Sequence, residues 1–319
     1  MLNIIKGIIN RIIKNKAYLL MAFVVTPIVI ISAIYFNDSS FSKINIAVVG
    51  ENTVNWDSDK VNITVVNSRV PKSDLVKNKY DAVVYFNRGQ ATVDSVKSKE
   101  FVSRIENMIN GQDVSVDVKD KKGVITNIAS FIVMFMLFLG IMLYKYYFDE
   151  RNGIYKRIIM SNISYGEYIG AHLIAVFIMI ELPVVIFTIL AKSIFNLETS
   201  VTNGQIIIIF TALSMLSASF GMLVSSIVRD SQSASMLGAM INVITTIMSG
   251  CFFSITNGGI IGKLSSVLPQ RNILDITIAL ENDIRVSRIS ILNVAVIIVF
   301  LIAATFSINI YKMKKNKYA

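Results

Sequence analysis

The sequence predicts an α-helical integral membrane protein with six transmembrane helices and a small extracytoplasmic α/β domain between the first and the second. Apolar residue types make up 54% of the 319 residues, charged types make up 16%, and the mean hydropathy is +0.61. A soluble domain carries about 25% charged residues. The apolar residues are gathered in runs of about 20, the length that an α-helix needs to cross the ~30 Å hydrocarbon core of a bilayer.

The apolar runs set the positions of the predicted spans. The first is predicted at 17–36, where Pro27 should kink the helix. The other five lie within a transmembrane region at 123–319, and they are predicted at 124–147, 167–192, 205–228, 233–256 and 290–311. The stretch 257–289 alternates apolar and polar residues around Pro269. It predicts two short amphipathic helices, either at the outer face or partly re-entrant.

Residues 1–16 predict an amphipathic helix that lies on the membrane surface on the cytoplasmic side. Isoleucines recur near helical spacing in this segment, and four basic residues lie between them. The alternative is a cleavable signal peptide with a basic first part. The apolar run that follows is long and is not followed by a cleavage site of small residues, which favours the surface helix.

The segment 37–122 differs sharply in composition from the predicted spans. Strands are predicted at 41–49, 61–66 and 80–86, and helices at 73–79 and 95–110. The segment holds 13 basic and 12 acidic residues, so it is nearly neutral. A domain of about 85 residues is long enough to bury a modest core of its own.

The basic residues outside this domain orient the chain. Six spans place both termini on one side of the membrane, and the short segments on that side carry 13 Lys and Arg residues against 5 on the other side. This bias predicts a multi-pass protein of the cell membrane with both termini cytoplasmic and residues 37–122 extracytoplasmic. Because the excess charge flanks the spans, the partners it favours are membrane lipids, and nucleic acid is excluded. With one cysteine and one histidine, the chain cannot build an intrachain disulfide or a His/Cys metal cluster.

The segment 148–166, between the second and third predicted spans, is short and rich in charge. An acidic–basic pair, Glu150 and Arg151, precedes Gly153, and a basic-apolar stretch leads from there to Ser161. This order resembles the loop of ABC type-2 transporter permeases, in which an acidic–basic pair precedes a Gly, a basic-apolar stretch, a small residue, Pro, an aliphatic residue and Ser. The matching positions are Glu150, Arg151, Gly153, Arg157, Ser161, Ile163, Ser164 and Tyr168. Two positions depart from the pattern, because Ile154 replaces the usual Thr and Asn162 replaces the usual Pro.

The resemblance extends over most of the chain, from the basic N-terminal helix, which resembles the family's elbow helix, to the amphipathic stretch before the last span. It implies the transmembrane half of a transporter, completed by a cytoplasmic ABC ATPase subunit and by a second permease, either a copy or a related half. ATP and Mg²⁺ would be bound by the ATPase, so this chain is expected to hold no cofactor or metal and to be no enzyme. The residues Gly262 and Lys263 do not form a P-loop, because Asn257 and Leu264 replace the first Gly and the Ser or Thr.

Contact with the ATPase is expected through 148–166, which we call the coupling segment. A short charged segment between two spans can transmit a displacement to both. The residues expected to couple are Asp149, Glu150, Arg151, Gly153, Lys156, Arg157, Ser161 and Tyr168. The alternative is that these charges only anchor the spans in the headgroup region.

Glu181 is the most informative residue within the predicted spans. An ionisable group near the middle of a span costs about 2.5 kcal/mol or more, and it usually faces a cavity or a partner. Glu181 is therefore a candidate for the transport pathway, and the alternative is a structural glutamate bonded to a neighbouring span. The other pathway candidates are Pro183, Ser217, Gly221, Asn242, Thr245 and Thr246. Small residues such as Ser217 and Gly221 also serve plain helix packing.

The resemblance implies a permease subunit of an ATP-driven exporter, with an amphipathic cargo such as a drug, an antimicrobial peptide or a lipid. The alternative is a multi-span receptor or sensor whose outer α/β domain binds a ligand without transport. No paired catalytic constellation is present that would indicate an enzyme. An ATPase with a P-loop encoded beside this chain would favour the transporter.

Overall fold

The chain forms two compact units, which we describe separately. The computed structural model describes residues 1–39, 44–50, 61–66, 70–71, 75, 80, 82–87, 90–95, 99–109, 123–151, 163–197, 199–252 and 260–317. The first unit combines Met1–Asn37 with Lys122–Ala319, and the second is Asp38–Lys121. The sequence predicts the inserted domain at 37–122, so its limits and those of the second unit differ by one residue at each end.

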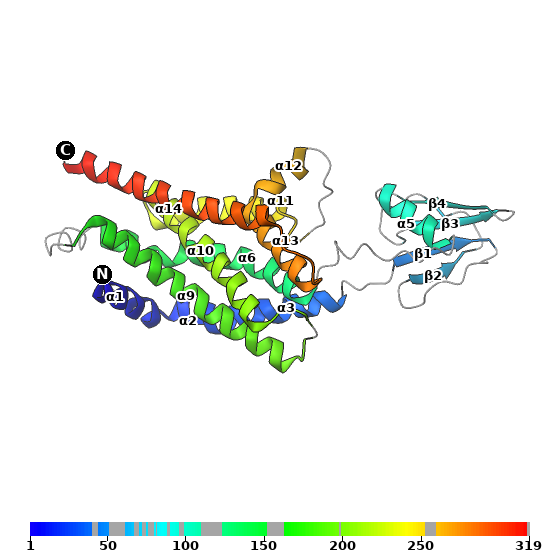
Figure 1. Cartoon of the computed structure of the whole chain (residues 1–319), viewed down its shortest axis with the longest axis horizontal. Helices are drawn as coiled ribbons and strands as arrows, with labels where there is room; N and C mark the ends of the chain where they lie inside the picture. Colours follow the sequence, from blue (N-terminus) through cyan, green and yellow to red (C-terminus); the bar gives the residue numbers. More distant parts are fainter. Residues whose placement is uncertain are drawn as a thin grey trace. The chain divides into compact units, whose positions relative to one another are not determined.

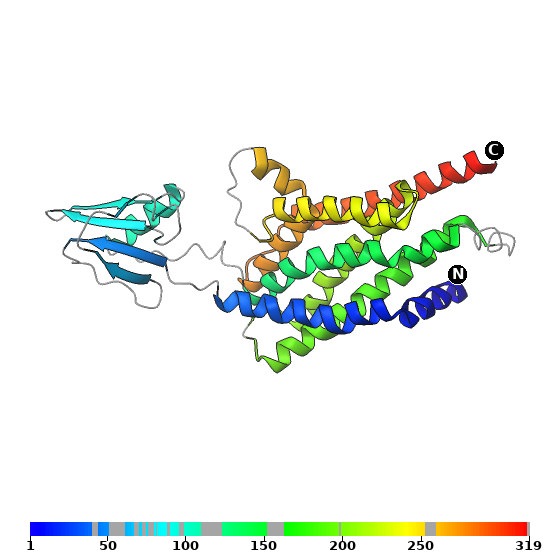
Figure 2. The ribbon, with the colours of Figure 1, turned by 180° about the vertical axis from the view of Figure 1, so that it is seen from behind.

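The first unit is a bundle whose long helices run along a common direction (Figure 1). Its elements are α1 Leu2–Lys14, α2 Lys16–Leu20, the π-helical turn η1 Met21–Val25, α3 Thr26–Ser39, α6 Val124–Leu143, α7 Lys145–Arg151, α9 Tyr165–Ile194, α10 Asn203–Ile227, α11 Ser231–Met248, α12 Ile260–Val267, α13 Pro269–Glu281 and α14 Arg288–Lys317. The shorter α12 and α13 are inclined to the long helices (Figure 1). The helices α1, α2 and α3 follow one another along one side of the bundle (Figure 2). Both chain ends lie at the same end of the bundle, which we call the terminal end (Figure 1).

Five helical segments among the described residues are long and apolar enough to cross a membrane. They are Lys16–Phe36, Val124–Glu150, Tyr165–Ile194, Asn203–Ile227 and Arg288–Lys312. The sixth predicted span, at 233–256, corresponds to α11, which ends at Met248. The prediction is too long, because the chain turns directly after Met248 and Gly250 takes a φ of +80°. The 18 residues of α11 lie near the lower limit for a span, and they include polar residues such as Asn242.

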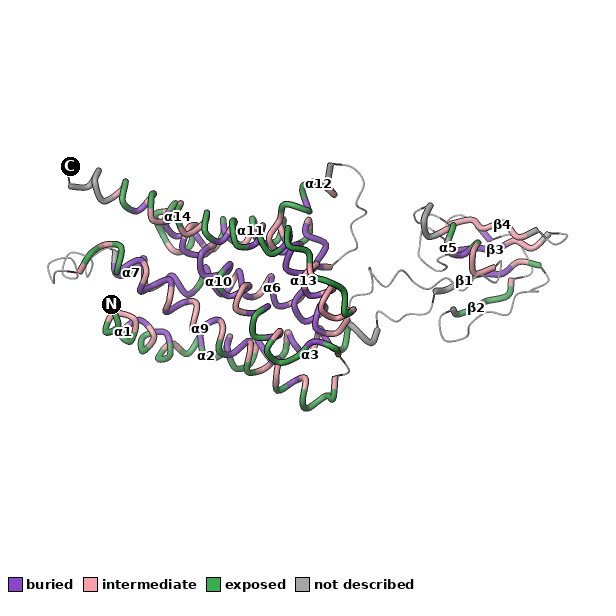
Figure 3. The backbone as a smooth tube through the Cα atoms, in the orientation of Figure 1, coloured by how far each residue is buried: buried purple, intermediate pink, exposed green. Residues whose placement is uncertain are grey.

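The core of the bundle lies around α6, which packs against α10, α11 and α13. Figure 3 shows most of α6 as buried or partly buried. The closest approach joins α6 to α10, where a Cβ built on Gly140 would lie 2.5 Å from the carbonyl oxygen of Ser217. A Cβ on Gly221 would in turn lie 2.6 Å from the carbonyl oxygen of Gly140. The two backbones are therefore in direct contact, as small residues permit in membrane helices.

The starts of α9, α10 and α11 are capped by side chains that the sequence places directly before them. Ser164 and Glu167 form a capping box at α9, and Thr202 and Gln205 form another at α10. Asp230 caps α11 by accepting from the backbone N–H of Ser233 at 2.8 Å, and this backbone hydrogen bond lowers the pKa of Asp230. Each cap satisfies N–H groups that a helix start leaves without an intrahelical partner.

The start of α6 is capped from another helix, at the end of the bundle opposite to the terminal end. Its N-cap residue is Gly123, which has no side chain to offer. The Glu281 carboxylate at the end of α13 accepts from the backbone N–H groups of Ile125 at 2.7 Å and Thr126 at 3.1 Å. Ser200, in the connection between α9 and α10, donates to the backbone oxygen of Glu281 at 2.7 Å. Glu281 therefore joins α6, α13 and the α9–α10 connection.

The second unit contains a four-stranded sheet in the order β2-β1-β3-β4. The strands are β1 Ile44–Val49, β2 Val61–Val65, β3 Ala82–Asn87 and β4 Gln90–Asp94, and the helix α5 spans Lys99–Ile109. Strand β1 pairs in parallel with β2 and β3, and β4 pairs with β3 in antiparallel fashion. Ile105 of α5 packs with Ile46 and Val84 on one face of the sheet, and Val70 and Leu75 pack on the other. Strand β4 has no counterpart among the predicted strands.

Candidate functional site

The candidate site lies where α7 and the first turn of α9 flank the middle of the coupling segment. Asp149 is exposed on α7, and Arg151 is the last residue of that helix. Gly153, Lys156, Arg157 and Ser161 lie outside the described residues, so their expected role stays a prediction. Glu150 and Tyr168, in contrast, are only 2% exposed.

Glu150 is the centre of a polar cluster that joins three elements at the terminal end. We call Arg11, Glu150, Tyr168 and His172 the Glu150 cluster. The Tyr168 hydroxyl donates to Glu150 Oε2 at 2.6 Å, and His172 Nε2 lies 3.1 Å from the same oxygen. The Arg11 guanidinium of α1 donates to Glu150 Oε1 and forms an ion pair with it. The carboxylate thus joins the end of the second span to both α1 and α9.

The burial of Glu150 explains why it needs these partners. A carboxylate removed from water is tolerated only when charge partners and hydrogen-bond donors compensate for the lost hydration. The Arg11 side chain is 45% exposed, whereas that of Glu150 is 3% exposed, so the arginine brings its charge to the cluster from the surface. A second contact supports the same pairing, because the Tyr146 hydroxyl of α7 donates to the backbone oxygen of Arg11 at 3.2 Å.

A second polar cluster lies at the terminal end and centres on Asn309 of α14, which is 1% exposed. We call Tyr147, Tyr165, Ser226 and Asn309 the Asn309 cluster. Asn309 Oδ1 accepts from the hydroxyl of Tyr147 at 2.7 Å and from that of Tyr165 at 2.9 Å. Its Nδ2 donates to Ser226 Oγ at 2.6 Å. Asn309 therefore connects α14 with α7, α9 and α10.

Aromatic rings connect the two clusters. Tyr147 and Tyr168 have ring centroids 6.2 Å apart, and those of Tyr147 and His172 are 5.6 Å apart. Tyr165 and Tyr168 stack at 6.3 Å. Such pairs contribute about 0.5–1.5 kcal/mol each beyond burial alone. The two clusters therefore form one packed region around the ends of the coupling segment.

Part of this region carries a signal in the sequence that the predictions did not use. Tyr165, Tyr168 and His172 follow one another at spacings of three and four residues, so they share one face of α9. Arg11 follows Ile8 by three residues, and Ile8 is buried. No spacing indicates Asn309, because its partners come from three other helices.

The structure gives Glu181 a hydrogen-bond partner that the sequence did not indicate. Thr211 of α10 donates from Oγ1 to Glu181 Oε1 at 2.7 Å, whereas Glu181 Oε2 is buried and has no hydrogen-bond partner among the described residues. Pro183 lacks an N–H group, so the backbone oxygen of Met179 loses its helical partner. The Tyr18 hydroxyl of α2 donates to that oxygen at 2.8 Å. These contacts join α9 to α10 and to the start of the first span.

The remaining pathway candidates lie at contacts between helices. Ser217 and Gly221 lie at the close approach of α10 to α6 described above. Asn242 Nδ2 donates to the backbone oxygen of Met134 at 2.7 Å, and Asn242 Oδ1 accepts from Thr246 at 3.0 Å. Thr245 accepts from Gln270 Nε2 of α13 at 2.9 Å. Asn242, Thr245 and Thr246 lie together on α11, whereas Glu181 lies on α9.

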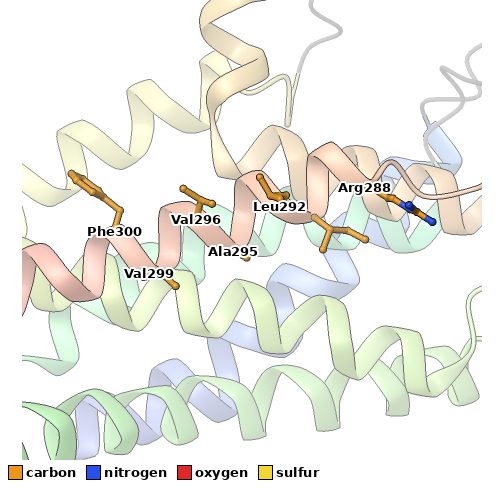
Figure 4. Close-up of a pocket in the computed structure, with 7 residues that line it drawn as sticks. Arg288, Leu292, Ala295, Val296, Val299 and Phe300 are labelled. Atoms are coloured by element: carbon orange, nitrogen blue, oxygen red, sulfur yellow. The ribbon is translucent and has the colours of Figure 1, made fainter.

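An apolar groove of about 690 Å³ runs along the exposed side of α14 (Figure 4). It is lined by Arg288, Ile291, Leu292, Ala295, Val296, Val299 and Phe300. None of the predicted pathway residues lines this groove. The groove is apolar along its length apart from Arg288, which lies at the start of the helix, as is suited to a surface within a bilayer.

Comparisons with known proteins identify the family. The family model described as ABC-2 type transporter matches residues 84–281, which cover well over half of the chain. A comparison with curated proteins gives no match. The matched range includes the coupling segment and the helices α6, α7, α9, α10, α11, α12 and α13, but it excludes α1 and α14. Together with the five apolar helices, the match shows a multi-pass membrane protein that is itself not catalytic: the chain belongs to the ABC-2 type transporter family as a permease component.

Proposed function

We propose that this chain is the permease subunit of an ATP-driven ABC exporter. It couples ATP hydrolysis by a separate cytoplasmic ATPase to the efflux of an amphipathic substrate, which is a drug, an antimicrobial peptide or a lipid. A second permease, either a copy or a related half, completes the assembly. The family match supports the permease role. It also supports an ATPase partner, because permeases of this family normally work with one.

The observation that carries this proposal is the environment of Glu150. The coupling segment begins at the end of the second span, and Glu150 lies in its third position. A displacement of α7 must move the Glu150 carboxylate, which is bonded to Arg11 of α1 and to Tyr168 of α9. The same displacement therefore reaches three helices. This is the arrangement that an ATPase docked on the coupling segment requires in order to rearrange the spans.

The exposed and buried members of the coupling segment suggest two different roles. Asp149 is exposed and available to a partner, whereas Glu150 is buried among residues of its own chain. We assign docking to Asp149 and transmission to Glu150. ATP and Mg²⁺ belong to the partner, which supplies the hydrolysis that drives the transport cycle. Export is the favoured direction because the large inserted domain is expected on the extracytoplasmic side.

The test is reconstitution of the full chain with a P-loop ATPase, for which one encoded beside this chain is the first candidate. Asp149→Arg should reduce co-purification of the ATPase. Glu150→Gln should leave the complex intact but lower permease-stimulated ATP hydrolysis about tenfold, because the neutral amide loses the charge that pairs with Arg11 and one of the acceptor oxygens that Tyr168 and Arg11 use. Efflux is followed with ethidium, a labelled cationic amphipathic peptide and a labelled phospholipid, which separate the three cargo classes.

Lys145→Ala is the matched control, because Lys145 is exposed on the same helix and no hydrogen bond of its side chain is present among the described residues. If Glu150→Gln stimulates ATP hydrolysis as strongly as the unaltered chain does, Glu150 does not transmit the motion. If no ATPase co-purifies and a soluble ligand binds the inserted domain instead, the receptor or sensor alternative takes the place of the transporter.

A further inference from the structure

The ends of the coupling segment are also joined to the C-terminal helix, which lies outside the residues matched by the family model. Tyr147 directly precedes the coupling segment, and Tyr165 is the last residue but one within it. Both hydroxyls donate to Oδ1 of Asn309, at 2.7 Å and 2.9 Å. A single side chain of α14 thus holds both ends of the segment on which the ATPase is expected to dock.

The hydrogen-bonding capacity of Asn309 is fully used. An asparagine side chain offers two acceptor sites on its oxygen and two donors on its nitrogen. The oxygen serves Tyr147 and Tyr165, and the nitrogen donates to Ser226 Oγ at 2.6 Å and to the backbone oxygen of Thr305 at 2.8 Å. A buried polar group with every bond made has one favoured position, because any shift leaves a buried donor or acceptor unpaired.

A second contact fixes α14 to the end of α10 at the same level. The Lys312 ammonium donates to the backbone oxygen of Ser226 at 2.6 Å. A lysine placed over the last carbonyl groups of a helix stabilises that helix end. The end of α10 and the terminal part of α14 are therefore held together by two neighbouring side chains, Asn309 and Lys312.

We propose that α14 is a second output of the coupling segment and that Asn309 is its positioning residue. A displacement of the coupling segment moves Tyr147 and Tyr165 together, and their bonds to Asn309 move α14. The helix is continuous from Arg288 to Lys317, so it carries the motion over about 30 Å to the start of the span near Arg288. This inference rests on the proposed function, since it assumes that an ATPase acts on the coupling segment.

The experiment compares the far ends of two helices in the reconstituted complex. Spin labels are attached at Ile289→Cys on α14 and at Ile194→Cys on α9, two positions that are 71% and 70% exposed. The native Cys251 is buried, so labelling is selective for the added cysteines. The probe is a non-hydrolysable ATP analogue, and the readout is the change in label mobility and in distance to a second label on the ATPase.

Asn309→Ala and the double variant Tyr147→Phe with Tyr165→Phe should abolish the response at residue 289 and preserve it at residue 194. The kcat of stimulated ATP hydrolysis should fall about fivefold at unchanged KM, with each rate normalised to the amount of folded complex so that a loss of folded protein does not produce the same result. The double variant keeps the hydrogen bond from Asn309 to Ser226. It therefore still tests the proposal if Asn309→Ala does not fold. Ser307→Ala is the control, because its exposed hydroxyl donates to the backbone oxygen of Ala303 on its own helix.

The outcomes separate the two proposals. If residue 289 still responds in both variants, α14 is not driven through Asn309 and the inference is overturned. If residue 194 responds in the unaltered chain but residue 289 does not, the inference fails while the proposed function stands. If neither position responds and ATP hydrolysis is not stimulated, the proposed function fails and the inference falls with it.

Discussion

Two glutamates, Glu150 and Glu281, each join three elements, and they lie at opposite ends of the bundle. Glu150 contacts charged and polar side chains, whereas Glu281 receives two backbone N–H groups at the start of α6. Burial raises the pKa of Glu281, and the hydrogen bonds from Thr126 and Ile125 lower it by less. The folded state therefore holds the Glu281 proton more tightly than the unfolded chain does.

This pKa shift predicts a pH-dependent stability that Glu281→Gln removes. Because the folded pKa lies above the ordinary value of 4.5, the stability contributed by this group is complete below 4.5 and is lost as the pH rises through the folded pKa. The difference in free energy of unfolding between the unaltered chain and Glu281→Gln should therefore increase as the pH is lowered from 7 towards 4.5. Thermal unfolding in detergent across this range checks it, and parallel pH profiles for the two proteins would contradict it.

The helices α6 and α10 approach so closely that their backbones touch at Gly140 and Gly221. The contact depends on both residues lacking a Cβ, because the atoms that a Cβ would meet belong to the opposite backbone and cannot rotate away. The small-residue pattern Ser217 to Gly221 was one of the pathway candidates in the sequence. In the structure it lies at the packed centre of the bundle, where the α6–α10 contact fixes the distance between the two helices.

Gly221→Ala should destabilise the bundle by about 1–3 kcal/mol, since the added methyl group forces α6 and α10 apart. Gly204→Ala is the control on the same helix, because nothing lies within 4 Å of a Cβ at that position. It should be neutral or stabilise by up to about 1 kcal/mol, as alanine is the better helix former. Unfolding of both variants in detergent measures the difference, and an equal effect of the two substitutions would refute the packing argument.

The whole chain combines a helical bundle with an inserted α/β unit that has cores of its own on both faces of its sheet. Both termini lie at one end of the bundle (Figure 1). Five of the described helical segments have the length and composition of a span, and α11, which carries more polar residues, packs against α6. The buried contact of Asn242 with Met134 of α6 shows how one of these polar groups is satisfied by protein instead of lipid.

The basic residues near the termini predict that the inserted unit is outside the cell. Ser103→Cys, at an exposed position of α5, should react with a membrane-impermeant maleimide in intact cells. Lys145→Cys, at an exposed position of α7, should react only after the membrane is made permeable. The reverse pattern would show that the topology is inverted. Labelling at both positions in intact cells would mean that the cells are leaky.

The positions of the long helices could be predicted from the sequence, because apolar runs of about 20 residues are rare outside membrane spans. The prediction failed at α11, where an apolar run continues past Met248 although the helix does not. It also missed the partners of Glu150 and Asn309, since these come from helices far apart in the chain. Local spacing indicates the face of a helix, as for Tyr165, Tyr168 and His172, but it does not indicate which helix that face meets.

The hydrogen bonds of Asn309 can form only late in the synthesis of the protein. Tyr147 and Tyr165 precede Asn309 by 162 and 144 residues, so both leave the ribosome long before their shared acceptor exists. At about 5–20 residues per second, the interval is roughly 7 to 30 s. During it the two hydroxyls have no Asn309 to bind, and the Glu150 cluster is left to hold the ends of the coupling segment. A nascent chain therefore acquires the hydrogen bonds of Asn309 only when α14 enters the membrane.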